Sequence, residues 1–282
     1  MKITIIIPVY NEQAHIEHML GSLVGQTIKP SQVIIVDDNS TDNTPSIIKK
    51  YVDTYPWITT VNTHKTSKHS PGAKVIEAFY KGYEKCSIDA QLIGKFDADI
   101  ILPSNYLEKM IGIFASDNLV GMASGNLYIK KRDAWIFENI SEKTKVRGPI
   151  KLYKKECFEA IGGLKKSIGW DTVDGLLAAF HGWKTKTDPL LHVKHLKATG
   201  NAYTSGAKHK QGEAFYKMRY SKTLTRIAAL KLAVSKKDPL FYLHCMQGYN
   251  ISKKQKQPFI VSKQEGEFIR NFRWKAIKKK IL

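Results

Sequence analysis

The sequence predicts an α/β fold with a mostly parallel sheet flanked by helices, and three apolar runs are the main evidence. Residues 3–9 form a run rich in β-branched side chains that Pro8 interrupts, and residues 33–36 and 92–96 form two more. Runs of this length and composition are typical of buried strands. Apolar residues at helical spacing separate the first two runs: Ile16, Met19, Leu20, Leu23 and Val24. This alternation indicates parallel strands whose faces are covered by helices.

Polar side chains follow each of these three strands. They are Tyr10, Asn11 and Glu12 after the first strand, Asp37 and Asp38 after the second, and Asp97 and Asp99 after the third. In open parallel sheets, ligands bind outside the carboxyl ends of the strands. Thr44 and Pro45 then predict the start of a helix, with Thr44 as its N-cap. We therefore expect one functional edge of the sheet, where these polar residues meet.

The pair of Asp97 and Asp99, separated only by Ala98, is the most informative motif. Two neighbouring carboxylates repel each other and lose hydration on burial unless a cation lies between them. Mg²⁺ fits this place, because proteins bind it through one or two carboxylates together with substrate phosphates. The alternative is a surface turn that happens to hold two acids, and so short a motif does not exclude it.

The chain-level properties fit a cytoplasmic protein. With 282 residues the chain is long enough for one large α/β core and an extension. No apolar segment approaches the length of a membrane-spanning helix, and we expect no secretory leader at Met1. The three cysteines, Cys86, Cys157 and Cys245, are far apart, which argues against a disulfide framework or a cysteine metal site.

The positive charge is concentrated near the C-terminus. Residues 201–282 hold 19 of the 45 Lys and Arg but only 4 of the 25 Asp and Glu, so they carry +15 of the net charge of +20. The glycines and polar residues of segment 201–210 predict a linker or mobile loop. We expect an α/β domain over residues 1–200 and a basic, mostly helical extension over residues 201–282.

The last residues of the extension combine an apolar stripe with a basic surface. Residues at roughly helical spacing form the stripe: Phe268, Ile269, Phe272, Ala276, Ile277 and Ile281, with Trp274 at its edge. Six basic residues fill much of the remaining surface: Arg270, Arg273, Lys275, Lys278, Lys279 and Lys280. Such a helix is typical of an anionic membrane surface, where each basic residue contributes about 1 kcal/mol. The alternative is a helix packed on the protein's own core with a solvated basic face.

Five motifs together identify a family. They are IIIPVYNE at residues 5–12, VIIVDDNSTDNT at 33–44, FDADI at 96–100, RGPIKLYKKECFEAIGGL at 147–164 and GWDTVDG at 169–175. Their order and spacing resemble the family 2 glycosyltransferases of the GT-A fold over roughly residues 1–200. The resemblance implies a Rossmann-like sheet, a donor half at residues 1–100 and an acceptor half at residues 101–200. It also implies inverting sugar transfer from a nucleotide-sugar donor, expected to be a UDP-sugar, to a saccharide or lipid-linked hydroxyl, in polysaccharide or glycan synthesis with Mg²⁺ or Mn²⁺.

The resemblance gives donor-binding and metal-binding roles to individual residues. The expected donor-binding residues are Pro8, Tyr10, Glu12, Asp37, Asp38, Lys74 and Asp97. Carboxylates suit the recognition of uracil and ribose because they accept hydrogen bonds from ring N–H and hydroxyl groups, although Asp also caps turns. The expected metal ligands are Asp99, Asp97 and His195. A metal there would neutralise the diphosphate leaving group as the sugar bond breaks.

The segment GWDTVDG stands where the family carries its Glu-Asp catalytic motif. Asp171 matches the Asp of that motif if Trp170 replaces the Glu, and a shifted register would place Asp174 there instead. Helical spacing of the following apolar residues puts Asp171 at a helix N-terminus, whose positive end stabilises a carboxylate. An inverting transfer needs such a group as general base, although Asp171 could also act only as an N-cap. Gly148 and Trp170 are the expected acceptor contacts, Trp170 by stacking on a sugar ring or by packing alone.

Two other classes of protein share some of these features. A sugar nucleotidyltransferase also uses acids and Mg²⁺ on an α/β sheet, but residues 9–12 lack its Gly-rich phosphate loop. A non-enzymatic nucleic-acid-binding protein would explain the basic, aromatic extension. The ordered acidic motifs argue against nucleic acid as a partner, because they repel phosphate in the absence of a metal.

Overall fold

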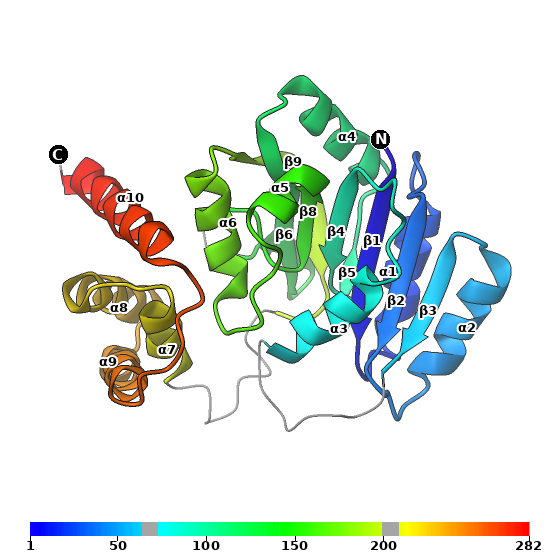
Figure 1. The fold of residues 1–282 in the computed structure, drawn as a ribbon. Coiled ribbons are helices and arrows are strands. Elements are labelled where there is room, and N and C mark those ends of the chain that lie inside the picture. Colours follow the sequence, from blue (N-terminus) through cyan, green and yellow to red (C-terminus); the bar gives the residue numbers. More distant parts are fainter. Residues whose placement is uncertain (64–72, 141, 199–208, 282) are drawn as a thin grey trace.

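A computed structural model describes residues 1–63, 73–140, 142–198 and 209–281 (Figure 1). Its strands are β1 Ile3–Val9, β2 Gln32–Asp37, β3 Ile58–Asn62, β4 Leu92–Phe96, β5 Ile100–Ile101, β6 Val120–Lys131, β7 Ala134–Phe137, β8 Ile150–Lys154 and β9 Lys184–His195. Its helices are α1 Ile16–Val24, α2 Thr44–Thr54, α3 Ala73–Tyr83, α4 Tyr106–Ser116, α5 Lys155–Ala160, α6 Trp170–Phe180, α7 Lys210–Lys217, α8 Lys222–Lys236, α9 Pro239–Lys254 and α10 Lys263–Ile281. Most of the expected linker, at residues 201–208, lies outside the described residues.

The strands form one sheet in the order β3-β2-β1-β4-β8-β6-β9-β5, with β7 paired to β6. β1 runs parallel to both β2 and β4, and β2 runs parallel to β3. β8 is antiparallel to its neighbours β4 and β6, and β9 is parallel to β6. The predicted α/β sheet flanked by helices is confirmed. Its first half is parallel and its second half is mixed.

Strands β1, β2 and β4 occupy the three predicted apolar runs. Pro8, which was expected to interrupt the first run, lies inside β1 and pairs in register with Val36 of β2. The ladder between β1 and β4 ends at Ile6, so at Pro8 the strand has a partner on one side only. Proline is tolerated in such a place because its missing N–H costs no ladder hydrogen bond there.

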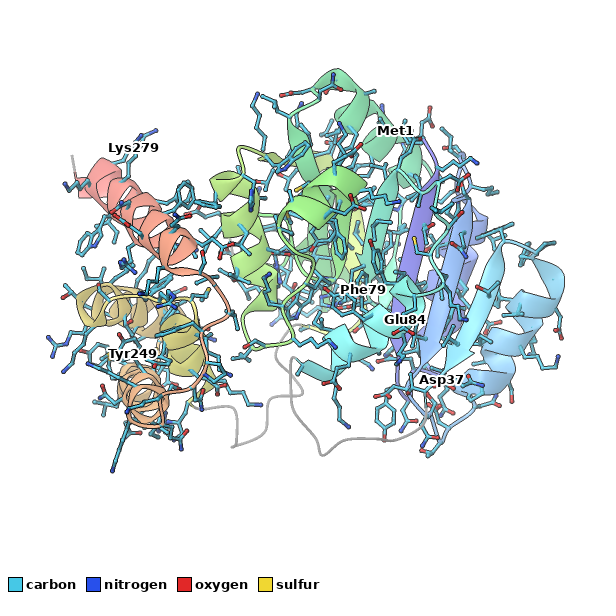
Figure 2. The ribbon with its side chains drawn as sticks, in the orientation of Figure 1. Met1, Asp37, Phe79, Glu84, Tyr249 and Lys279 are labelled. Atoms are coloured by element: carbon cyan, nitrogen blue, oxygen red, sulfur yellow. The ribbon has the colours of Figure 1, made fainter. Side chains whose placement is uncertain are left out.

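The side chains of β1 and β2 alternate between two apolar cores. Ile6 and Ile34 face a core formed with α3, α5 and α6, whereas Ile5 and Ile35 face a core formed with α1, α2 and α4. Phe79 of α3 is fully buried in the first of these cores (Figure 2). Burial on both faces explains why the strands are continuous apolar runs and show no alternation of apolar and polar residues.

The helices α7–α10 form an additional layer beside α6 (Figure 1). Phe215 and Ile269 belong to the same apolar core as Val173 of α6. Phe180 at the end of α6 meets Phe268 of α10 edge to face, with 5.4 Å between the ring centroids. The extension therefore shares a core with the α/β part, and the division near residue 200 stays a prediction.

Helix α10 uses part of its predicted apolar stripe and of its basic surface for this packing. Ile269 is fully buried, whereas Phe272 is 43% exposed. Arg270 Nη1 donates to the Arg219 carbonyl oxygen at 3.0 Å, and Arg273 Nε donates to the Tyr220 hydroxyl at 2.8 Å. The first half of α10 is therefore a packed helix. None of the helices in the described part of the chain combines the length and apolar character needed to cross a membrane.

Candidate active site

The loops that follow β1 and β2 are joined by hydrogen bonds at the carboxyl edge of the sheet. Asn11, in the left-handed region with φ of 52°, donates its backbone N–H to Ser40 Oγ at 2.9 Å. The Glu12 N–H donates to Thr44 Oγ1 at 2.8 Å. Thr44 is thus the first residue of α2 and not its expected N-cap, because its hydroxyl serves the neighbouring loop. These bonds fix the predicted polar residues relative to one another.

A cavity of about 340 Å³ opens beside these loops, and four of the predicted donor-binding residues line it: Pro8, Tyr10, Asp38 and Lys74. Tyr10 is 52% exposed, so the face of its ring is available to a planar ligand. Lys74 lies in the first turn of α3 and brings a cation to the same cavity. The cavity therefore combines an aromatic ring, a carboxylate and an ammonium group.

The other predicted donor residues lie near this cavity without lining it. Asp37 is 5% exposed, and its Oδ1 accepts the Ser40 N–H at 3.0 Å, as in a turn cap. Both carboxylate oxygens of Glu12 accept hydrogen bonds from Lys197 Nζ at 2.7 Å. Glu12 thus ties the loop after β1 to the segment that follows β9.

Asp97, Asp99 and His195 come together at the same edge, because β5 pairs with the end of β9 and sets Ile100 opposite His195. His195 Nε2 is 3.7 Å from Asp99 Oδ1. Burial and the charge of Asp97 raise the pKa of Asp99, His195 opposes both, and the resulting pKa is about 6. Asp97 points instead to the buried Lys95, with which it forms an ion pair.

A buried pair of side chains behind His195 holds its ring. His195 Nδ1 is 3.3 Å from Glu138 Oε2, and Arg147 Nη2 donates to the same oxygen at 3.0 Å. Burial alone would lower the pKa of His195, but the hydrogen bond to Glu138 and the charge of Asp99 raise it. A carboxylate that orients a histidine in this way is the usual second layer of a metal site.

The donor set fits a divalent cation only in part. Asp99 and His195 present an oxygen and a nitrogen 3.7 Å apart, and a cation would offset the burial and the charge of Asp97 that raise the pKa of Asp99. Within the described residues, no group of three or more His, Cys, Asp or Glu side chains is arranged to hold a metal. A cation here would depend on further oxygens from a diphosphate or from water.

The two candidate bases lie in different environments. Asp171 is half-buried in the first turn of α6, and Gly169 is the residue at the N-cap position. Asp174, one turn later, is 1% exposed, and its carboxylate accepts hydrogen bonds from Lys151 Nζ and from the Tyr153 hydroxyl, both at 2.6 Å. A carboxylate held between two buried donors has no route to an acceptor hydroxyl, so this geometry favours Asp171.

Trp170 packs against two buried lysines of the site. It is 8% exposed, and the ammonium groups of Lys95 and Lys151 lie 5.1 and 5.5 Å from its ring centroid. A Cβ on Gly148 would meet Asp171 Cβ at 3.4 Å and the Trp170 ring at 3.5 Å. Gly148 is therefore buried against the candidate base and the Trp170 ring, and Trp170 is chiefly a packed residue.

A comparison with known protein families identifies the family of this chain. The sequence model described as glycosyl transferase family 2 matches residues 4–164. The chain belongs to glycosyl transferase family 2. The matched residues include every strand and loop that forms the donor-side cavity, together with Asp97, Asp99 and Gly148.

Several curated relatives match part of the sequence of this family 2 glycosyltransferase. The minor teichoic acid biosynthesis protein GgaA of Bacillus subtilis is 28% identical over 166 residues, which cover 57% of this chain and 36% of that protein. The dolichol-phosphate mannosyltransferase of Pyrococcus furiosus is 26% identical over 218 residues, covering 73% and 57%. The chain spans about half the length of the curated relatives it matches.

Solved structures share the fold of this family 2 glycosyltransferase. S. aureus TarS 1-349 in complex with UDP-GlcNAc superposes with a TM-score of 0.58 at 18% identity, over 78% of this chain and 65% of that one. The mannosyltransferase PcManGT from Pyrobaculum calidifontis, in complex with GDP-Man and Mn²⁺, gives a TM-score of 0.60 at 18% identity, over 98% and 80%. At such identity these neighbours establish the GT-A fold alone.

Four buried residues of this site received no predicted role from the sequence: Lys95, Lys151, Glu138 and Arg147. Lys95 and Lys151 stand opposite each other on β4 and β8, and each is paired with a carboxylate. A lysine inside an otherwise apolar strand is the pattern that could have indicated them, since a buried lysine needs a partner. Glu138 and Arg147 have no such pattern, because they meet only through the fold.

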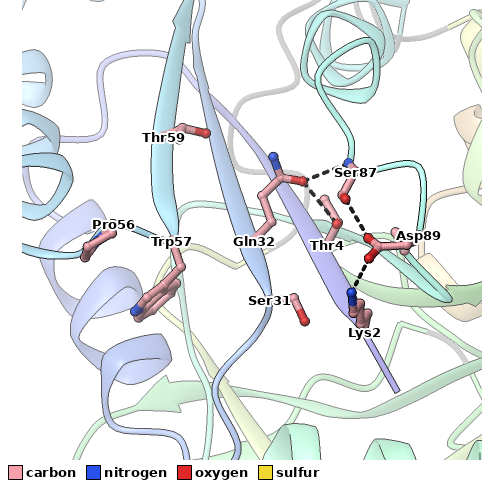
Figure 3. Close-up of a pocket in the computed structure, with 10 residues that line it drawn as sticks. Lys2, Thr4, Ser31, Gln32, Pro56, Trp57, Thr59, Ser87 and Asp89 are labelled. Carbon is pink, nitrogen blue, oxygen red and sulfur yellow. Dashed lines mark hydrogen bonds and ion pairs between the residues drawn. The ribbon is translucent and has the colours of Figure 1, made fainter.

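A second cavity, of about 370 Å³, lies at the opposite edge of the sheet (Figure 3). Its polar side chains bond to one another: Gln32 Oε1 accepts from Thr4 Oγ1 and from the Ser87 N–H, and Lys2 pairs with Asp89. None of the predicted site residues lines it. The candidate active site of this family 2 glycosyltransferase is therefore the carboxyl edge.

Proposed function

We propose that this protein transfers a sugar, with inversion at the anomeric carbon, from a nucleotide-diphosphate donor to a hydroxyl of a saccharide or lipid-linked acceptor, in glycan or polysaccharide synthesis. The observation that carries the proposal is the cavity lined by Tyr10, Asp38 and Lys74 at the carboxyl edge of the sheet. An aromatic ring, a carboxylate and a cation are the groups that would recognise a base, a ribose and a diphosphate. The UDP-GlcNAc complex of TarS supports a UDP-sugar as donor, and the GDP-Man complex of PcManGT makes a GDP-sugar the alternative.

Mg²⁺ or Mn²⁺ is the proposed cofactor. Asp99 and His195 would hold the cation, and Asp97 would reach a metal-bound water or the donor ribose. When bound, the cation supplies positive charge that stabilises the diphosphate as the sugar bond breaks. Glu138 orients the His195 ring for this purpose, and Lys95 fixes the position of Asp97.

Asp171 is the proposed general base. The first turn of α6 places its carboxylate near the positive helix end, and its side chain is only half-buried, so an acceptor can approach it. It would take the proton from the acceptor hydroxyl as the oxygen attacks the anomeric carbon. Lys151 Nζ donates to the Asp171 carbonyl oxygen at 2.7 Å and so supports this turn of the helix.

The proposed acceptor surface lies next to Asp171. Gly148 lies against Asp171 there, and Lys145 Nζ contacts Thr172 Oγ1 at 3.2 Å in the first turn of α6. Partial desolvation lowers the pKa of Lys145, and the charge of Asp171 opposes this effect. An acceptor would thus approach between a carboxylate and an ammonium group.

We also propose that the protein is cytoplasmic and binds peripherally to anionic membrane through its basic extension. The exposed residues Lys275, Lys278 and Lys279 in the second half of α10 support this proposal, with Phe272 beside them. A lipid-linked acceptor would be concentrated at the same surface. The inward contacts of Arg270 and Arg273 limit the contribution of the first half of the helix.

A binding screen tests the donor assignment. Thermal unfolding is measured with a panel of UDP- and GDP-sugars, each with Mn²⁺ and with EDTA, because a ligand that binds the folded state raises its apparent stability. We expect UDP-sugars to raise Tm only in the presence of Mn²⁺. Stabilisation by GDP-sugars alone selects the alternative donor, and no response to any nucleotide sugar refutes the proposed function.

A further inference from the structure

A cavity of about 480 Å³ lies within the helical extension, apart from the donor-side cavity. Three cations line it, one from each of three different segments: Arg219 after α7, Lys253 on α9 and Arg270 on α10. No acidic residue is among its lining residues, and in the described part of the chain none of these cations forms an ion pair with a carboxylate. Like charges gathered around a cavity without counter-charges repel one another, unless an anion joins them.

The guanidinium group of Arg219 is held in place from several directions. Arg219 has a left-handed backbone with φ of 58°, and its Nε donates to the Val261 carbonyl oxygen at 2.9 Å. The guanidinium carbon lies 3.7 Å from the centroid of the Phe259 ring. A Cβ on Gly266 would come within 2.5 Å of Arg219 Cδ, so α10 can pass this side chain only with glycine there. The two Nη nitrogens have no partner among the described residues.

Aromatic rings form the remaining wall of the cavity. Tyr216 and Phe259 lie with their ring centroids 5.0 Å apart, and Tyr249 meets Tyr216 edge to face at 5.7 Å. Their faces provide an apolar surface beside the cations. A ligand that suits both parts has a strongly anionic group attached to a carbon skeleton, such as a sugar or a polyol.

The anionic group that fits best is a phosphate. Guanidinium groups bind phosphate oxygens through paired N–H donors in a fixed plane, and a preorganised guanidinium loses little freedom on binding. A carboxylate has only two acceptor oxygens, which are too few for three cations on different sides of the cavity. A phosphate offers more acceptor oxygens, and they point in several directions.

The helix α10 that lines the cavity also contacts α6, which carries the proposed base. Tyr220 also lines the cavity, and its hydroxyl accepts a hydrogen bond from Arg273 at 2.8 Å. Arg273 acts electrostatically on Lys145, which contacts Thr172 next to the proposed base Asp171. Figure 2 shows Tyr249 among the helices of the extension, well away from Asp37 at the donor side.

We propose that this cavity is a binding subsite for a phosphate group carried by the acceptor, as a phosphomonoester or phosphodiester of a polyol or sugar. The location on the acceptor side rests on the proposed function; the phosphate chemistry rests on the cavity itself. The same chemistry occurs in a phospholipid head group, so the test has to separate a soluble phosphate from a lipid.

The alternative is that Arg219 and Arg270 only hold α10 in place through their bonds to backbone oxygens. Lys253 separates the two interpretations, because its ammonium group makes no hydrogen bond or ion pair with the described residues. Lys254 follows it on α9, is also exposed, and does not line the cavity. Lys253→Ala and Lys254→Ala are therefore matched variants of equal charge, and neither loses a side-chain hydrogen bond or ion pair with the described residues.

The experiment measures binding of glycerol 3-phosphate and of glycerophosphoglycerol by isothermal titration calorimetry, with glycerol as the neutral control. We expect both phosphates, but not glycerol, to bind the full chain, and Lys253→Ala to weaken binding about fivefold or more. Lys254→Ala should stay within about twofold of the unchanged protein. UDP-sugar binding is measured on the same samples, so failure of the proposed function is seen separately.

The source of the phosphate is tested with vesicles of phosphatidylcholine alone and with one quarter phosphatidylglycerol. Soluble phosphates that bind through Lys253, with vesicle binding equal in the two variants, support an acceptor phosphate. Vesicle binding lost only in Lys253→Ala, with no binding of the soluble phosphates, assigns the site to a lipid head group and overturns the acceptor proposal. Equal behaviour of Lys253→Ala and Lys254→Ala toward every probe overturns the subsite altogether.

Discussion

Lys151 and Asp174 form an ion pair that is closed off from solvent, with each side chain 1% exposed and 2.6 Å between Nζ and Oδ2. Tyr153 donates a further hydrogen bond to the same carboxylate. Removal of one partner from such a pair leaves a buried charge without compensation. An amide in place of the Asp174 carboxylate would keep its shape but not its charge. Asp174 is therefore a structural acid, whereas Asp171 on the same helix is the proposed base.

The first prediction compares Asp171→Asn with Asp174→Asn. Asp174→Asn should lower the free energy of unfolding by about 3–5 kcal/mol, because Lys151 stays buried and charged. Asp171→Asn should leave Tm nearly unchanged and reduce transfer by about 10²-fold or more, because only the proton acceptor is lost. Thermal unfolding and turnover are measured on both variants. A stable Asp174→Asn protein without activity, beside an active Asp171→Asn protein, would reverse the assignment of the base.

This contrast marks how far the sequence could predict the site. The apolar stripe after Trp170 correctly placed Asp171 in the first turn of α6, but the same motif left Asp174 open as an alternative in a shifted register. What separates them is Lys151 on β8, twenty residues or more away in the chain. Partners brought together by tertiary structure cannot be read from a motif, and the same holds for Glu138 behind His195.

The strands and helices that a single continuous stretch of sequence determines were predictable. The runs at residues 3–9 and 92–96 match β1 and β4, because strands buried on both faces are continuous apolar segments. The mixed second half of the sheet was not predictable, since direction is set by how β8 and β9 return to the sheet. The side-chain contacts of Arg270 and Arg273 with the neighbouring helices were not predicted, because a basic residue on a helix normally indicates solvent exposure.

The second prediction concerns the carboxylate behind the histidine. Glu138→Gln should weaken Mn²⁺ binding by about 10–100-fold, because the His195 ring loses the charged carboxylate that orients it. Asp99→Ala should abolish measurable binding. Calorimetric titration of Mn²⁺ in the presence of UDP checks both, with Lys2→Ala at the opposite edge of the sheet as control. Unchanged Mn²⁺ affinity in Asp99→Ala would remove this edge as the metal site.

The third prediction concerns pH. The pKa of Asp99 is about 6, raised by burial and by Asp97, so the carboxylate is protonated below that value. A metal ligand has to be deprotonated, and the raised pKa of His195 acts in the same direction. Mn²⁺ affinity should therefore fall about tenfold between pH 7 and pH 5. An affinity that stays constant over this range would show that neither group binds the metal.

The fourth prediction concerns the membrane. Reversal of the exposed charges in the variant Lys275→Glu, Lys278→Glu, Lys279→Glu should release the protein from vesicles with one quarter phosphatidylglycerol at low salt, since each basic residue contributes about 1 kcal/mol. This variant is preferable to deletion of residues 266–282, which would also uncover the core around Ile269. Vesicle sedimentation at low and high salt gives the answer. Equal recovery of both proteins in the supernatant supports the packed-helix interpretation of α10.

The most direct test of the central claim is the anomeric configuration of the first product. The protein is incubated with Mn²⁺ and an α-linked UDP-sugar selected by the binding screen, with water or a saccharide as acceptor, and the anomeric proton is followed by NMR. We predict release of UDP and a first-formed β-anomer, with both lost in Asp171→Asn. An α-anomer as first product, or pyrophosphate in place of UDP, would contradict inverting glycosyl transfer at this site.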